Sequence, residues 1–372
     1  MKNTIGRHVC CTIFGESHGS AIGITLDGLP AGIAIDEQFM LEQMDKRKAK
    51  GRISTQRHEA DLPKIISGVF EGYTTGTPLT ILIQNNDQHS SDYEKTKNRL
   101  RPAHADYTAD VKYLGYQDYR GGGHFSGRIT APLVAAGAIA LQILKNQDIH
   151  IASHIIKCHT VSDDAFAQSE EQLKAQIQAL RSTSFPTIRE EAQIAMIKEI
   201  EAAAANGDSV GGIIESAVIN VPAGIGEPFF DSLESIIAHY LYSIPAVKGV
   251  AFGLGFGFSE HTGSEANDSI AFENNRVVTK TNNNGGINGG ISNGMPIMIQ
   301  TCVKPTPSIY KEQDTINKAT KQAEKLIIQG RHDPAIIHRA CVVVDSVLAL
   351  AILDCMMERS AVLALQDKRK ED

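Results

Sequence analysis

A serine and a histidine stand side by side in a glycine-rich stretch near the N-terminus, which reads GESHG at residues 15–19. The stretch fits G-x-S-x-G, the nucleophile elbow of hydrolases, in which a sharp strand-to-helix turn exposes a serine oxygen. It also fits a proton-handling loop centred on His18. The elbow predicts a helix directly after the stretch, with an acid and a histidine much later. A proton-handling loop instead needs basic groups and other histidines around it.

Four further segments contain side chains that bind anions or transfer protons. Residues 46–57 are rich in lysine and arginine, a composition that the negative end of a helix also favours. Residues 101–108 read RPAHADYT and residues 330–334 read GRHDP; a structural loop and a structural salt bridge are the respective alternatives. Residues 120–130 read RGGGHFSGRIT, and glycines followed by hydroxyls, an arginine and a helix start predict an anion-binding nest. It is not a P-loop, because the G-K-[ST] ending is absent.

The chain of 372 residues is acidic overall, with a formal net charge of −7, so nucleic-acid binding is not indicated. An anionic ligand must therefore be held by a local basic cluster. The histidines, carboxylate and guanidiniums of these segments together suit a substrate that carries phosphate and carboxylates and undergoes proton transfer at one end.

Cysteine usage and hydropathy lead us to expect a cytoplasmic protein. The six cysteines form no C-x-x-C pair, which argues against a tetrahedral zinc site and fits buried thiols in a reducing cytosol. No apolar signal segment is visible at the N-terminus. The longest apolar run, residues 341–357, contains Asp345 and Asp354, so no membrane-spanning segment is expected.

The elements around the candidate residues are predicted from periodicity and end signals. Strands at residues 9–14 and 21–26 flank the GESHG stretch, and the second stands where the elbow requires a helix. The expected helices cover 36–48, 105–114, 130–145, 170–181, 188–205, 231–243 (capped by Asp231 and Glu234) and 314–329, with a last helix from 345. The other expected strands cover 64–70, 79–83, 149–156, 212–221, 250–258, 295–303 and 341–344.

An internal repeat is visible without reference to any other protein. GESHG at 15–19 matches GDSVG at 207–211, and LPAGI at 29–33 matches VPAGI at 221–225 with the same spacing between copies. The histidine of the first copy becomes Val210 in the second. A duplicated unit of strands followed by a helix explains both matches.

We therefore expect a single domain over residues 1–372, with pseudo-repeat halves at approximately 1–150 and 200–345. Blocks of neighbouring strands and helices favour an α+β fold with antiparallel sheets and helical layers over a doubly wound parallel sheet.

Eight short motifs stand in order along nearly the whole chain: GESHG (15–19), STQR (54–57), RPAHADYT (101–108), RGGG (120–123), VKGV (247–250), GGISNG (289–294), KPT (304–306) and GRHDP (330–334). This set resembles the chorismate synthase family. The resemblance implies an internally duplicated β-α-β sandwich, a homotetramer and a lyase of the shikimate pathway, which leads to aromatic amino acids. The reaction would be the anti 1,4-elimination of phosphate from 5-enolpyruvylshikimate 3-phosphate to give chorismate. It requires reduced FMN although it has no net redox change.

The resemblance also implies roles for individual residues. His18 would protonate or steady the departing phosphate, His104 would lie at the flavin's pyrimidine end, and Asp333 would help remove the proton that the flavin collects. Ser17 and Ser126 would relay protons to the two histidines, whose pKa values cationic neighbours should lower. The implied substrate-binding residues are Arg47, Arg52, Arg57 and Arg128, and the implied flavin contacts are His124, Phe125, Ser126, Pro245, Ala246, Gly289, Lys304, Pro305, Thr306, Pro307, Ser308 and Arg331.

The sequence departs from the family's common pattern at several of these positions. His124 and Phe125 replace an arginine and a serine, Ala103 stands where glycine is usual, and Pro245 where asparagine is usual. No extra flavin-reductase segment is visible, so a monofunctional enzyme with an external flavin reductant is implied, NADPH acting only indirectly. There are two alternatives. A serine hydrolase built on the elbow is disfavoured, because a strand is predicted where the elbow needs a helix and the basic segments would have no role. The second is a flavin- or nucleotide-binding protein without catalysis.

Overall fold

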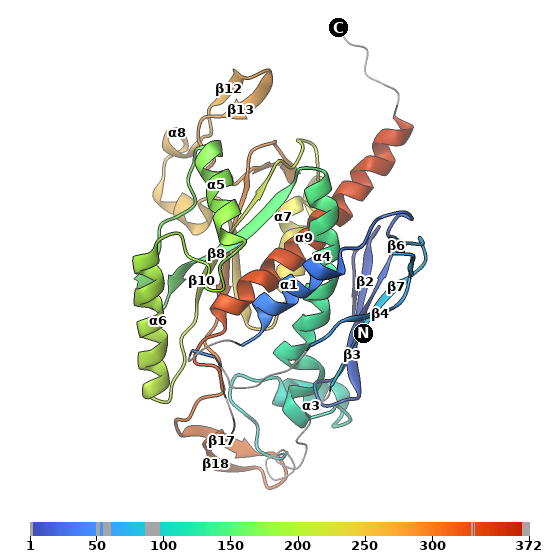
Figure 1. The fold of residues 1–372 in the computed structure, drawn as a ribbon. Helices are drawn as coiled ribbons and strands as arrows, with labels where there is room; N and C mark the ends of the chain where they lie inside the picture. The colour runs from blue at the N-terminus through green and yellow to red at the C-terminus, as the bar shows by residue number, and fades with distance from the viewer. Residues whose placement is uncertain are drawn as a thin grey trace.

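Two five-stranded antiparallel sheets lie on either side of a layer of helices in this computed structural model, which describes residues 3–49, 53–54, 61–85, 97–328, 330 and 332–366 (Figure 1). The first sheet has the order β1 (Thr4–Ile5), β2 (Cys10–Gly15), β3 (Ala21–Asp27), β7 (Leu79–Gln84), β4 (Lys64–Ser67). The second has the order β11 (Val247–Phe252), β16 (Ile297–Val303), β10 (Gly212–Ile219), β8 (His150–Cys158), β9 (Val161–Ser162).

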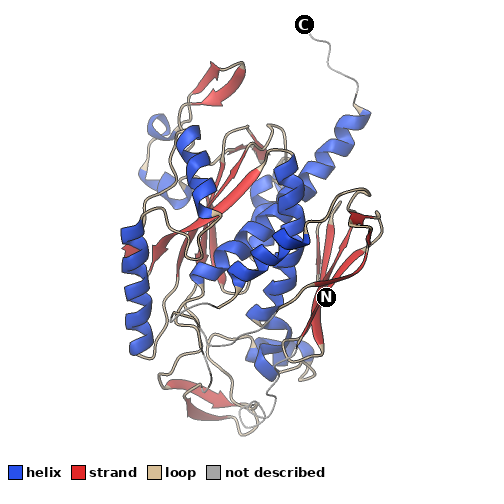
Figure 2. Ribbon diagram, viewed as in Figure 1, coloured by secondary structure: helices blue, strands red, loops and turns tan. Residues whose placement is uncertain are grey.

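The helices form an inner and an outer layer, which Figure 2 shows in blue beside the red strands. The inner layer contains α1 (Glu37–Arg47), α4 (Thr130–Asn146), α7 (Leu233–Leu241) and α9 (Ile337–Leu365). Helices α5 (Glu170–Leu180) and α6 (Glu190–Ala205) lie outside the second sheet. The shorter elements are α3 (Asp106–Tyr113), α8 (Gly263–Ala266), the 3-10 turns at Arg120–Phe125, Gly127–Ile129, Phe229–Asp231 and Gly255–Glu260, and the hairpins Val69–Phe70/Tyr73–Thr74, Ile270–Glu273/Arg276–Thr279, Ile287–Asn288/Ile291–Ser292 and Gln313–Asn317/Gln322–Leu326.

Four strands of each sheet follow the same order, and the fifth differs, since β1 precedes β2 in the chain whereas β9 follows β8. Taken from β1 in one sheet and from β9 in the other, β2 corresponds to β8, β3 to β10, β7 to β16 and β4 to β11. The helices occupy equivalent places in the two halves, because α1 comes after β3 as α7 comes after β10, and α4 comes after β7 as α9 comes after β16. The α+β prediction with internal duplication is thereby confirmed. The boundaries of the halves stay a prediction, and β8 lies between the two predicted ranges.

Alternation along β3 decides which face of the first sheet is buried. Ile22, Ile24 and Leu26 are each at most 1% exposed, as expected for side chains that share one face of a strand. They pack toward α4, which crosses α9 so closely that a Cβ at Gly137 would lie 2.2 Å from Cβ of Ser346. The crossing of these two helices forms the centre of the core.

Two helical segments are long and apolar enough to cross a membrane by length and composition, Gly127–Asn146 and Ile337–Leu365. Their most apolar windows are 67% and 83% buried inside the protein. Both contain core helices between the two sheets, and their burial against protein accounts for their hydropathy.

Five predicted elements are wrong or displaced. The strand at 341–344 and the helix from 345 are one helix, α9, because residues 337–355 are buried on nearly all sides and show no amphipathic period. Residues 314–329 fall in the hairpin of β17 (Gln313–Asn317) and β18 (Gln322–Leu326) instead of a helix. Helix α7 is capped by Ser232, which accepts from the Ser235 amide, instead of Asp231. The strand predicted at 250–258 ends at Phe252 and is followed by a 3-10 turn.

Candidate active site

The GESHG stretch forms a tight turn between two antiparallel strands, β2 and β3. Ser17 and His18 are each 8% exposed. The Ser17 hydroxyl donates to the Arg120 carbonyl at 3.2 Å and lies 3.1 Å from Nδ1 of His18. Because a hydroxyl has one proton, Ser17 accepts from Nδ1–H, which makes Nε2 the basic nitrogen of a neutral His18 ring. A strand follows the turn, so the nucleophile-elbow hypothesis is wrong.

The triple-glycine segment encloses this turn. Gly121, Gly122 and Gly123 have φ values of +57°, +89° and +54°, a conformation that glycine adopts without strain. A Cβ at Gly121 would lie 2.1 Å from Cε1 of His18, so only glycine lets the backbone come this close. The Ser17 amide also donates to the Gly123 carbonyl at 3.1 Å. The segment therefore fixes the imidazole from one side.

Residues that follow the glycines are tied to the same turn. Nδ1 of His124 donates to the Gly15 carbonyl at 2.7 Å, so this ring is held by backbone at the end of β2. Ser126 caps the next 3-10 turn by accepting from the Arg128 amide at 3.3 Å. Phe125 is 42% exposed, with its ring centroid 6.1 Å from that of Tyr113.

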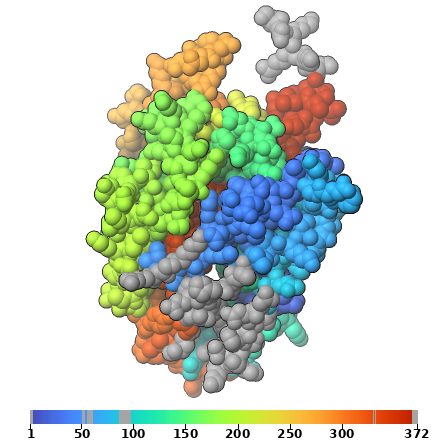
Figure 3. Space-filling model, in the orientation of Figure 1, coloured from blue at the N-terminus to red at the C-terminus, as the bar shows by residue number. Residues whose placement is uncertain are grey.

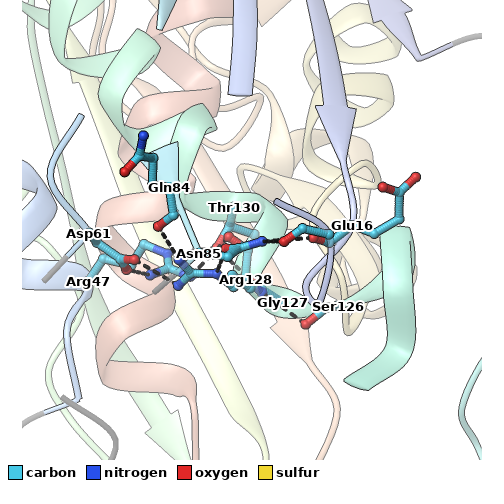
Figure 4. Close-up of polar contacts among 10 residues, drawn as sticks. Glu16, Arg47, Asp61, Gln84, Asn85, Ser126, Gly127, Arg128 and Thr130 are labelled. Carbon is cyan, nitrogen blue, oxygen red and sulfur yellow. Dashed lines mark hydrogen bonds and ion pairs between the residues drawn. The ribbon is translucent and has the colours of Figure 1, made fainter. Parts of the chain in front are cut away.

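Two arginines predicted to bind substrate share one carboxylate (Figure 4). Asp61 accepts from Arg47 at 3.0 Å and from Arg128 at 2.7 Å. Arg47 also donates to the Thr130 hydroxyl at 3.0 Å and to the carbonyls of Gly127 and Arg128 at 3.2 and 3.3 Å. Burial lowers the pKa of Arg47 to about 10, which Asp61 opposes, so the guanidinium stays charged at neutral pH.

His104 forms a hydrogen bond with a residue of the second half of the chain, Ser308. Its Nδ1 donates to the Pro102 carbonyl at 3.0 Å, and its Nε2 accepts from the Ser308 hydroxyl at 2.9 Å. Lys304 donates through Nζ to the Ala103 carbonyl at 2.7 Å and through its amide to the Ala246 carbonyl at 2.9 Å.

The residues around His104 come from distant parts of the chain, and two of them have a left-handed backbone conformation. Ala103 has φ of +58° and Ala246 φ of +76°, and the left-handed value at Ala103 explains why glycine is usual there. Ser209 of the second GESHG copy donates to the Thr306 carbonyl at 2.6 Å.

The His104 imidazole should remain neutral over the whole physiological range. Burial lowers its pKa to about 4, helped by the charge of Arg101. Nuclear magnetic resonance titration of the His104 ring, assigned with His104→Asn, should give a midpoint near pH 4. The unfolded chain binds this proton at about pH 6.5, so His104 contributes a loss of stability as pH falls from 6.5 to 4. A midpoint above pH 6 would contradict this description of the site.

The remaining predicted residues are placed as follows. Asp333 is 9% exposed and forms an ion pair with Arg339 at the start of α9. Gly289 lies in the turn between β14 (Ile287–Asn288) and β15 (Ile291–Ser292), and Pro245 is exposed before β11. In the described parts of the chain, no hydrogen bond or ion pair joins these last two to the other predicted residues. Arg52, Arg57 and Arg331 lie outside the described residues.

Sequence reasoning missed three residues that organise the site: Asp61, Asn85 and Thr130. Asp61 and Asn85 belong to no chemical motif, and partners lie far along the chain, such as Arg128 at 67 residues from Asp61. Thr130 ends the RGGGHFSGRIT segment, but no role of its own was predicted for it. The only available signal was their position, at a strand end or a helix start beside a basic segment.

A groove of about 820 Å³ lies beside α1, and Asp61 is among its lining residues. It is lined by α1, the end of α4, the start of β8 and the end of α5, and Figure 3 shows the blue surface of α1 near the green surface of α5 on this face. None of the predicted catalytic, substrate or flavin residues lines it. It borders the candidate site at Asp61, the carboxylate that Arg47 and Arg128 share.

Known chorismate synthases match this chain over nearly its whole length. The family model for chorismate synthase matches residues 9–357. A chorismate synthase from Thermococcus kodakarensis is 44% identical over 96% of this chain and 98% of its own length. One from Pyrococcus abyssi is 44% identical over 95% and 97%. A solved structure titled "Crystal Structure of Chorismate Synthase" superposes with a TM-score of 0.75 at 27% identity, covering 95% of this chain and 93% of that one.

Proposed function

This chain belongs to the chorismate synthase family, and we propose that it converts 5-enolpyruvylshikimate 3-phosphate to chorismate. The reaction is an anti 1,4-elimination in the shikimate pathway. It breaks the C–O bond to phosphate and one ring C–H bond, and it uses reduced FMN without net redox change. The observation that carries the proposal is the enclosed Ser17–His18 pair under the triple-glycine segment. Such a pair can hold a proton where an anion leaves.

His18 is proposed to protonate or steady the departing phosphate. Its Nδ1–H donates to Ser17, so Nε2 is proposed as the nitrogen that delivers the proton. Ser17 fixes this tautomer and Ser126 is proposed to relay protons near the flavin. Arg47 and Arg128 supply the positive charge that attracts the substrate's anionic groups.

The predicted flavin segments fit a bound flavin on three observations. Oγ1 of Thr306 is buried and has no hydrogen-bond partner among the described residues, so a ligand atom would satisfy it. Lys304 provides a cation two residues before Thr306. A Cβ at Gly289 would meet nothing within 4 Å, so there is open space beside this glycine. When bound, reduced FMN would lend electron density to the substrate and take up the ring proton. His104 stays neutral and adds no charge to the flavin's surroundings, and Asp333 is proposed to help carry that proton away.

The test is an anaerobic assay of phosphate release from 5-enolpyruvylshikimate 3-phosphate. We expect release with reduced FMN and none with oxidised FMN, because the lost ring hydrogen is not acidic. Activity that survives with oxidised FMN contradicts the proposed mechanism. Flavin binding without phosphate release indicates instead a binding protein without catalysis.

We also propose a cytoplasmic, homotetrameric and monofunctional enzyme whose flavin is reduced by an external donor. No turnover is expected when NADPH and oxidised FMN are supplied anaerobically without a reductase. Sustained turnover under those conditions contradicts the monofunctional proposal, and sedimentation at assay concentration measures the oligomeric state.

A further inference from the structure

Asp61 joins two largely buried arginines of the site, Arg47 and Arg128. Its carboxylate is 3% exposed, and the side chains of Arg47 and Arg128 are each 10% exposed. One oxygen, Oδ2, accepts from Arg47 and the other, Oδ1, from Arg128. Two guanidiniums held this close would repel each other strongly in a poorly solvated site without the carboxylate between them. With Asp61, the group keeps one net positive charge toward an anionic ligand.

Asn85 joins Arg128 to the turn that contains His18. Its Oδ1 accepts from Nε of Arg128 at 2.6 Å. Its Nδ2 donates to the carbonyls of Glu16 and Gly19 at 3.0 and 2.8 Å. These two carbonyls belong to the residues on either side of Ser17 and His18. A single amide therefore connects a cation and the histidine turn, as Figure 4 shows.

We propose that Asp61 and Asn85 are positioning residues that hold the anion-binding arginines and the His18 turn at one fixed geometry. This inference rests on the proposed function, because the roles of Arg128 and His18 come from it. Neither residue needs to touch the substrate. Their effect follows from the sensitivity of catalysis to small misplacements of the groups that do, since an error of 1 Å costs about 10²-fold in rate.

The first test compares Asp61→Asn with Asp61→Glu in the anaerobic assay. Asp61→Asn removes the charge that holds the two guanidiniums together, so kcat should fall by about 10²-fold. KM should change by less than about fivefold, because both cations remain to attract the substrate. Asp61→Glu restores the carboxylate and should recover at least about tenfold of the lost kcat. Asp27→Asn, an exposed carboxylate at the far end of β3, serves as the matched control and should behave as wild type.

The second test uses Asn85→Ala and a readout that needs no turnover. In the protein without substrate, nuclear magnetic resonance of the Arg128 Nε–H and the His18 ring should show both signals shifted, while the Arg47 Nε–H bonded to Thr130 stays in place. If wild type releases no phosphate, the proposed function fails and these signals still decide the positioning claim. The inference is overturned if His18 is unmoved in Asn85→Ala. A kcat of Asp61→Asn within threefold of wild type also overturns it, as does equal loss in Asp61→Glu. Should Asp61→Asn not fold, Asn85→Ala alone decides.

Discussion

Replacing His18 with alanine is expected to lower kcat for phosphate release by about 10²–10⁴-fold, the usual contribution of a positioned general acid or base. His18 is 8% exposed and its ring lies against the triple-glycine segment, and alanine places no titratable group there. Binding of reduced FMN should be retained, because His18 is not among the residues proposed to contact the flavin. The measurement is single-turnover phosphate release under anaerobic conditions.

Ser17→Ala is the matched comparison for His18→Ala. Ser17 sets the tautomer of the imidazole through a 3.1 Å contact and does not itself supply the proton. We expect a loss of about tenfold, because the other ring nitrogen can then carry the proton part of the time. Turnover of His18→Ala within threefold of wild type would remove His18 from the mechanism. An equal loss in both variants would make the serine as important as the histidine.

The elements that could be predicted from the sequence are those with local signals. Helix α1 was expected over residues 36–48 and covers Glu37–Arg47, because Asp36 accepts from the Phe39 amide at 2.9 Å as an N-cap. The strands around GESHG were predicted from β-branched residues at alternating positions. The start of α9 could not be predicted in this way, because residues 337–355 are buried on nearly all sides and no polar face marks the helix.

The hairpin of β17 and β18 shows how tertiary contacts outweigh local propensity. The segment 313–326 contains residues common in helices, yet it forms a hairpin. The Thr315 hydroxyl donates to the Leu100 carbonyl, and Asn317 forms an antiparallel β-bridge with Arg99. These contacts join residues more than two hundred positions apart, which periodicity does not register. Asp61 and Asn85 were missed in the site for the same reason.

The two copies of the turn lie in equivalent surroundings, although only the first contains the histidine. In the first half the Ser17 amide donates to Gly123 at 3.1 Å, just before α4. In the second half the Val210 amide donates to Pro334 at 2.8 Å, just before α9. Both turns therefore pack against the segment that precedes a central helix. The second copy places Asp333 there, so the two halves contribute different chemical groups through the same architecture.

Gly121→Ala is expected to lower kcat by at least about 10²-fold, because its Cβ would lie 2.1 Å from Cε1 and 2.3 Å from Nδ1 of His18. No imidazole position is compatible with such distances, so the ring, the glycine segment or both must move. The φ of +57° adds about 1 kcal/mol of backbone strain for any residue with a Cβ. Backbone strain alone lowers the stability of the fold but does not displace the His18 ring. The effect of strain can therefore be separated from the effect of contact with the ring.

Alanine substitutions at two other glycines of residues 120–130 distinguish the effect of backbone strain from the effect of contact with His18. Gly122→Ala carries a similar strain at φ of +89°, but its Cβ would only approach Ser126 at 3.8 Å. Gly127→Ala adds a methyl group that meets nothing within 4 Å. We expect kcat near wild type for Gly127→Ala, a lower melting temperature with modest loss of kcat for Gly122→Ala, and the large loss only for Gly121→Ala. Equal kcat values in Gly121→Ala and Gly122→Ala would mean that strain, and not contact with the imidazole, makes the triple glycine necessary.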